Sequence, residues 1–103
     1  MNTHALHLLR HSPVTHPSFN CWLRTVGPGQ SLLLIEDAVY ALLPDTRSVD
    51  ALRLLPGSVR LYALEDDLLA RGLALDDLPA QVTVIDYPRM VELCVEHAKA
   101  VSW

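Results

Sequence analysis

Residues 31–37 read Ser-Leu-Leu-Leu-Ile-Glu-Asp, and this stretch decides the fold class of the chain. Four large apolar residues follow one another, with glycine and proline turn residues before them and two acids after them. An uninterrupted apolar run of this length is typical of a parallel strand that is buried on both faces. Such a strand needs further strands beside it and helices on both sides of the sheet.

Strand and helix patterns alternate on either side of this run. We predict strands over residues 4–10, 31–35, 59–64 and 82–85, and helices over residues 18–26, 37–43, 48–55, 65–72 and 87–98. Helices between successive strands imply right-handed crossovers and a mostly parallel sheet. A chain of 103 residues is long enough for one core but not for two. We therefore predict a single-domain, three-layer α/β fold over residues 1–103.

Cys21 is the residue with a physical reason to be reactive. Ser18 is a good N-cap residue, which would place Cys21 at about the third position of a helix. Unpaired N–H groups and the positive end of the helix dipole stabilise an anion there, and the thiolate is the reactive form of cysteine. The alternative is that Cys21 is a small apolar side chain packed under Trp22.

The second thiol, Cys94, lies in an apolar stripe of the last predicted helix. The members of this stripe recur at spacings of three and four residues: Tyr87, Met90, Val91, Cys94 and Ala98. We therefore predict that Cys94 is packed in the core. The two cysteines have no CxxC spacing and do not form a disulfide framework, which indicates a reducing compartment.

Composition excludes several classes of function. The net charge is −4 and no basic run is present, so direct binding of nucleic acid by this chain is not expected. No apolar stretch approaches the roughly 20 residues of a membrane span, and residues 1–4 lack the basic region of a signal peptide. We expect a cytoplasmic protein without membrane contact. Because half of the residues are hydrophobic, we also expect an oligomer subunit.

The five histidines show no zinc-ligand spacing, so no metal site is predicted. Three of them are candidates to lie near Cys21 and favour its thiolate, namely His7, His11 and His16. Residues 27–31 precede a strand and lack the Lys-Ser/Thr step, so they are not a phosphate loop.

Acidic residues follow each of the later strands, at the edge of the sheet where sites lie in open α/β folds. They are Glu36, Asp37, Glu65, Asp66, Asp67 and Asp86. Helix capping, with Asp37 as one cap, accounts for most of them. A phosphorylated-aspartate site would also need a lysine on a late strand, and the only lysine, Lys99, lies in the predicted C-terminal tail.

These segments resemble the TusB/DsrH family of sulfur-relay subunits along nearly the whole chain. The matching segments are residues 6–9 with Ser12-Pro13, residues 32–41, residues 61–73, residues 84–87 and Trp103. Ala38 departs from the glycine that many members carry. The resemblance implies a three-layer fold of the flavodoxin-like, DsrEFH-like type.

The resemblance also implies a role. It points to a cytoplasmic hetero-hexamer of three related subunits, in which TusC/TusD-like or DsrF/DsrE-like sister subunits accompany this chain. In the Tus branch such a complex passes persulfide sulfur to a downstream carrier protein, toward 2-thiolation of the wobble uridine of tRNA. Cys21 matches a cysteine of DsrH-like members that some TusB members lack, which makes it a candidate persulfide carrier. No metal or organic cofactor is required.

Three alternatives stay open at this point. A DsrH-type subunit would serve a dissimilatory sulfur-oxidation relay with the same fold and similar chemistry. A purely structural subunit would complete the complex while a sister subunit carries the sulfur. A flavodoxin-like cofactor-binding module is a third class, and the missing phosphate loop argues against it.

Overall fold

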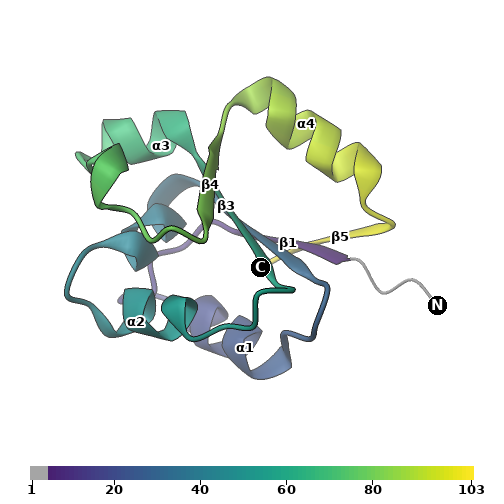
Figure 1. The fold of residues 1–103 in the computed structure, drawn as a ribbon, viewed down its shortest axis with the longest axis horizontal. Coiled ribbons are helices and arrows are strands. Elements are labelled where there is room, and N and C mark those ends of the chain that lie inside the picture. The colour runs from purple at the N-terminus through teal and green to yellow at the C-terminus, as the bar shows by residue number, and fades with distance from the viewer. Residues whose placement is uncertain (1–4) are drawn as a thin grey trace.

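The protein is built on one five-stranded parallel sheet with the strand order β4-β3-β2-β1-β5, seen in a computed structural model that describes residues 5–103 (Figure 1). The strands are β1 (Ala5–Leu9), β2 (Ser31–Leu34), β3 (Arg60–Leu64), β4 (Val82–Ile85) and β5 (Lys99–Ser102). All four pairings between neighbouring strands are parallel. His4, which we predicted at the start of the first strand, lies outside the described residues.

Helices connect the strands, as the alternating pattern predicted. The α-helices are α1 (Ser18–Thr25), α2 (Arg47–Arg53), α3 (Glu65–Ala70) and α4 (Tyr87–Glu96). Two further connections are 3-10 helices, η1 (Glu36–Leu42) and η2 (Leu75–Asp77). None of the helices within residues 5–103 is long and apolar enough to cross a membrane.

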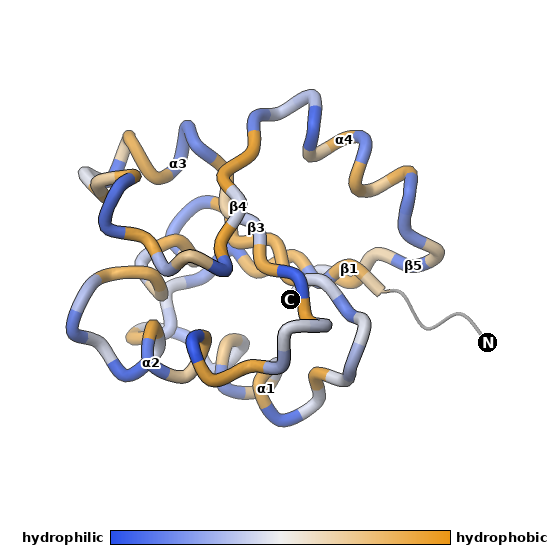
Figure 2. The backbone as a smooth tube through the Cα atoms, in the orientation of Figure 1, coloured by the Kyte–Doolittle hydropathy of each residue, from blue (hydrophilic) through white to orange (hydrophobic). Residues whose placement is uncertain are grey.

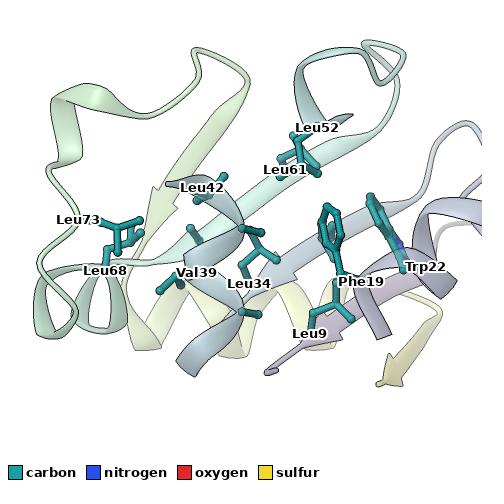
Figure 3. Close-up of a cluster of buried hydrophobic side chains, with 14 of the residues drawn as sticks. Leu9, Phe19, Trp22, Leu34, Val39, Leu42, Leu52, Leu61, Leu68 and Leu73 are labelled. Atoms are coloured by element: carbon teal, nitrogen blue, oxygen red, sulfur yellow. The ribbon is translucent and has the colours of Figure 1, made fainter. Parts of the chain in front are cut away.

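Strand β2 lies in the middle of the sheet, and all four of its residues are buried. Leu32 and Leu34 face the larger of two hydrophobic clusters, and Leu33 faces the smaller one. Figure 3 shows Leu34 among side chains from α1, η1 and α3. The two-sided burial predicted from the apolar run is confirmed.

The two faces of the sheet are covered by different helices. Strands β1 to β4 step in one direction, and β5 returns to pair with β1. Because crossovers between parallel strands are right-handed, the returning connection lies on the opposite face. That connection is α4, which lies across the sheet from α1 and α2 (Figure 1). α4 inserts Leu93 and Met90 into the smaller cluster.

The prediction for the C-terminal segment was wrong. The last helix ends at Glu96 instead of residue 98, and Lys99 belongs to a fifth strand instead of a tail. His97 ends the helix, because its Nδ1 bonds the carbonyl oxygen of Leu93 at 2.7 Å and its Nε2 bonds Ser31 Oγ at 3.1 Å. These bonds turn the chain back toward the sheet, where β5 pairs with β1.

A buried histidine ties the last residue to the first strand. Trp103 Nε1 donates to His7 Nδ1 at 3.0 Å, so the other ring nitrogen of His7 carries the proton and donates to Gln30 Oε1 at 2.9 Å. The backbone N–H of Trp103 also donates to the carbonyl oxygen of Leu8. Burial lowers the pKa of His7, an effect that the Gln30 bond opposes and the charge of Lys99 reinforces.

We predict a pH-dependent loss of stability that originates at His7. Its folded pKa lies below the ordinary value of about 6.5, so its stabilising contribution is complete above that pH. The contribution is lost as the pH falls through the lowered folded pKa. Urea unfolding at several pH values should show a smaller loss on acidification for His7→Gln than for the wild type. The exposed His11→Gln is the control, and an equal loss in His7→Gln and wild type contradicts the prediction.

Candidate functional site

The candidate site lies at the carboxyl edge of the parallel sheet, where the loops that follow β1 to β4 leave the strands. The loop after β1 leads into α1, which carries Cys21. Acids of the other three connections lie at the same edge, as the sequence predicted, because the carboxyl ends of parallel strands share one edge.

The start of α1 differs from the prediction that Ser18 is its N-cap. Pro17 occupies the cap position, and Ser18 is the first helical residue. The backbone N–H of Ser18 donates to Nδ1 of His16 at 3.2 Å, so an imidazole accepts the first N–H of the helix, and the Ser18 hydroxyl caps no N–H of the described chain. His16 also stacks on His11, with ring centroids 4.2 Å apart. The sequence did not reveal this role of His16, because serine is a far more common N-cap residue than the proline that precedes it.

Cys21 is the fourth residue of α1 and is half-buried. Its own N–H is used by the helix, since it donates to the carbonyl oxygen of Pro17 at 3.0 Å. A helical side chain leans toward the N-terminus of its helix, so the thiol lies over the first turn, at the positive end of the dipole. The thiol is therefore one residue further into the helix than expected, yet it still faces the N-terminal turn.

The structure places the three candidate histidines in different surroundings. His16 lies at the start of the helix that carries Cys21, and His11 stacks on it. His7 is instead held by Gln30 and Trp103. No group of three or more potential metal ligands occurs among residues 5–103.

Three of the acidic residues, Asp37, Asp67 and Asp86, are engaged in structural bonds. Arg71 bridges two connections, because it contacts Asp37 Oδ1 at 2.9 Å and Asp67 Oδ1 at 3.3 Å. The other carboxylate oxygen of Asp67 accepts the N–H of Glu36 at 2.7 Å, where the backbone takes a positive φ of 50°. Asp86 caps α4 through the N–H of Arg89.

One capping prediction was wrong. Asp37 does not cap the helix that follows β2, because η1 begins at Glu36 and its cap position, Ile35, has no capping side chain. Asp37 instead pairs with Arg71. A 3-10 helix that starts immediately after the strand leaves no separate cap position for the aspartate.

A groove lies between α1 and α2 beside the site, with a volume of about 540 Å³. Its walls include Phe19 and Leu23 of α1, Tyr40 of η1 and Arg47 of α2. Cys21 is not among the lining residues. The thiol therefore lies on a flank of α1 that the groove does not reach.

The prediction that Cys94 is packed in the core was wrong, because its side chain is exposed. The apolar stripe is real, but Met90 at its edge and Leu93 beside it are the side chains that pack on the sheet. Tyr87, Val91 and Val95 are 49%, 59% and 79% exposed. Figure 2 shows hydrophobic and hydrophilic positions alternating along α4. The periodicity identified an apolar face but did not show what covers it.

Exposure of Cys94 predicts that it reacts freely in the isolated chain. Iodoacetamide should alkylate Cys94 in the folded protein nearly as fast as in the urea-unfolded protein, whereas the half-buried Cys21 should be slowed by folding. Cys94→Ala should change the free energy of unfolding by less than about 0.5 kcal/mol, because the thiol fills no cavity. Peptide mass spectrometry reports both rates. A Cys94 that is protected in the folded isolated chain would contradict its placement.

Comparison with known proteins gives consistent matches over nearly the whole chain. A family model described as DsrH like protein matches residues 11–100. The protein TusB of Enterobacter sp. (strain 638) is 38% identical over 98 residues, which are 95% of this chain and 99% of that protein. The protein TusB of Escherichia coli (strain K12) is 37% identical with the same coverage.

Solved structures share the fold. The crystal structure of the ychN protein from E. coli has a TM-score of 0.74 at 14% identity, covering 98% of this chain and 100% of that chain. A protein of unknown function, MTH1491 from Methanobacterium thermoautotrophicum, has a TM-score of 0.68 at 19% identity, covering 96% of each chain. At these identities the likeness concerns the fold, and the predicted α/β class is confirmed.

Proposed function

The chain belongs to the DsrH-like protein family, and from that premise we propose that it is a TusB-type subunit of a sulfur relay that serves tRNA modification. The observation that carries the proposal is the 37–38% identity to TusB proteins over 95% of the chain. In this proposal persulfide sulfur passes through the complex in the cytoplasm to a downstream sulfur carrier protein. Its destination is 2-thiolation of the wobble uridine of tRNA.

Cys21 is the proposed carrier of sulfur on this chain. Its thiolate attacks the outer sulfur of a donor persulfide, a new S–S bond forms at Cys21, and the donor leaves as a thiolate. The sulfur atom moves without net oxidation or reduction. The position of Cys21 supports this role, because its side chain leans toward the N-terminus of α1, where the helix dipole favours an anion. Cys94, on the outer face of α4, is not assigned a carrier role.

The proposed assembly is a hetero-hexamer with TusC/TusD-like sister subunits, and α4 is its proposed contact on this chain. The exposed residues Tyr87, Val91 and Val95 are spaced four apart and form one outward stripe of the helix. Apolar side chains in such a row are costly to leave in water and are typical of protein interfaces. A sister subunit of the same family is therefore the occupant that we assign to this surface.

Substitution of the stripe should separate assembly from folding. Val91→Asp places a charge in the middle of the stripe, so co-purification with the sister subunits should be lost while circular dichroism and the unfolding midpoint change little. Leu54→Asp is the matched control, because Leu54 is also an exposed apolar residue but lies at the end of α2. Retention of Val91→Asp in the complex, or equal loss with Leu54→Asp, contradicts the placement of the interface.

Sulfur loading tests the carrier role. After incubation of the assembled complex with a cysteine desulfurase, intact-mass analysis should show one added sulfur atom on the wild-type chain and on Cys94→Ser. Cys21→Ser should fold and assemble but gain none, because the attacking thiolate is absent. Formation of 2-thiouridine should slow without stopping if a sister subunit holds another carrier. If the wild-type chain never gains sulfur, the carrier role is contradicted and this subunit is a structural component of the complex.

A dissimilatory sulfur-oxidation relay is the second candidate function, because the matching family model is described as DsrH-like. The two relays differ in the acceptor and not in the transfer step at the thiol. Neighbouring genes for dissimilatory sulfite reductase, together with unchanged tRNA thiolation after deletion of the gene, would favour the oxidation relay. Loss of 2-thiouridine on deletion would favour tRNA modification.

A further inference from the structure

Ser18 carries a buried hydroxyl that the rest of the described chain leaves without a hydrogen-bond partner. The residue is 4% exposed, and its Oγ bonds nothing among residues 5–103. Ser18 is the first helical residue and not the cap, and its hydroxyl accepts no backbone N–H of the described chain, so the side chain does not cap the helix. Buried hydroxyls in folded proteins are nearly always paired, because an unpaired one costs about 1–3 kcal/mol. The orphaned hydroxyl therefore points to a partner that residues 5–103 of the unmodified chain do not supply.

Cys21 is the side chain in position to bring that partner. Ser18 and Cys21 are three residues apart in α1, so their Cβ atoms are neighbours on the helix surface, about 5–6 Å apart. Because helical side chains lean toward the N-terminus, the Cys21 side chain lies over the turn that contains Ser18. The Cys21 sulfur itself does not accept a bond from the Ser18 hydroxyl. An added sulfur atom would extend the side chain by about 2 Å.

We propose that the Ser18 hydroxyl donates a hydrogen bond to the terminal sulfur of a persulfide carried on Cys21. The proposal rests on the proposed function of Cys21 as a sulfur carrier. The Cys21 thiolate attacks the outer sulfur of a donor persulfide, the donor S–S bond breaks, and the donor leaves as a thiolate. The proton of the transferred sulfur goes to solvent, which leaves an anionic terminal sulfur. A hydrogen bond to an ionised acceptor is roughly twice as strong as one between neutral groups.

A second orphaned donor on α1 provides a matched control. The indole Nε1 of Trp22 is also buried without a partner among the described residues. Trp22 packs in the larger cluster beside Phe19, with ring centroids 6.3 Å apart (Figure 3). Trp22→Phe removes that donor and keeps an aromatic ring. It should leave the lifetime of the persulfide unchanged if Ser18 is the donor.

The test compares the protein before and after sulfur loading. In the assembled complex, Ser18→Ala should keep the wild-type alkylation rate of Cys21 and an unloaded stability equal to or above the wild type, because the lost hydroxyl was unpaired. Once loaded by a cysteine desulfurase, it should lose its sulfur to cyanide about tenfold faster than the wild type. Ser18→Thr, which restores a hydroxyl, should recover the slow rate.

The outcomes separate the two proposals. Equal sulfur loss from wild type and Ser18→Ala overturns the role of Ser18 while sulfur loading of Cys21 stands. A faster loss from Trp22→Phe alone assigns the donor to Trp22 and also overturns it. A wild-type chain that gains no sulfur overturns the carrier function and the inference together. Ser18→Gly, which also lacks the hydroxyl, replaces Ser18→Ala if that variant does not fold.

Discussion

Burial of β2 on both faces is the constraint on which the rest of the structure depends. Leu32 and Leu34 need a helical layer on one side of the sheet, and Leu33 needs cover on the other. A parallel strand cannot be joined to its neighbours by tight hairpins, so every connection becomes a crossover with a helix in it. The carboxyl ends of β1 to β4 then meet at one edge, which brings the start of α1 and the acidic corners together.

The two faces satisfy this constraint unequally. One face is covered by α1, α2, α3 and η1, whereas a single returning helix of the described chain, α4, covers the other. Right-handed crossover geometry leads to this asymmetry, because β4 and β5 lie at opposite ends of the sheet. A lone helix buries one stripe and leaves its outer stripe in water. The exposed apolar side chains of α4 thus have their origin in the topology.

The start of α1 places a buried, unpartnered hydroxyl in the same turn as the candidate thiol. His16 accepts the first N–H of the helix, and the Ser18 hydroxyl caps no N–H and is buried without a partner among residues 5–103. Buried polar groups carry a free-energy cost that an apolar residue would avoid. Ser18 and Cys21 share the N-terminal turn of α1. The free-energy cost of the buried hydroxyl therefore arises beside the thiol that is proposed to carry sulfur.

Sequence alone determined the features that depend on local patterns. The unbroken run 32–35 predicted a central parallel strand, and the alternation of elements predicted the crossovers and the edge at which Cys21 and the acids lie. Such patterns indicate which residues are buried away from water and where a helix begins.

Only the tertiary structure decided the features that depend on a distant partner. The four residues of β5 carry no periodic signal, and their strand exists because β1 offers an open edge in register. Cys94 was assigned to the core because a stripe shows apolarity without showing what covers it. The cap of α1 was misplaced by one residue because the local pattern favours Ser18, whereas in the folded loop Pro17 takes the cap position and His16 accepts the first N–H of the helix. In each case the outcome depends on how the folded chain arranges its segments, which the local pattern does not contain.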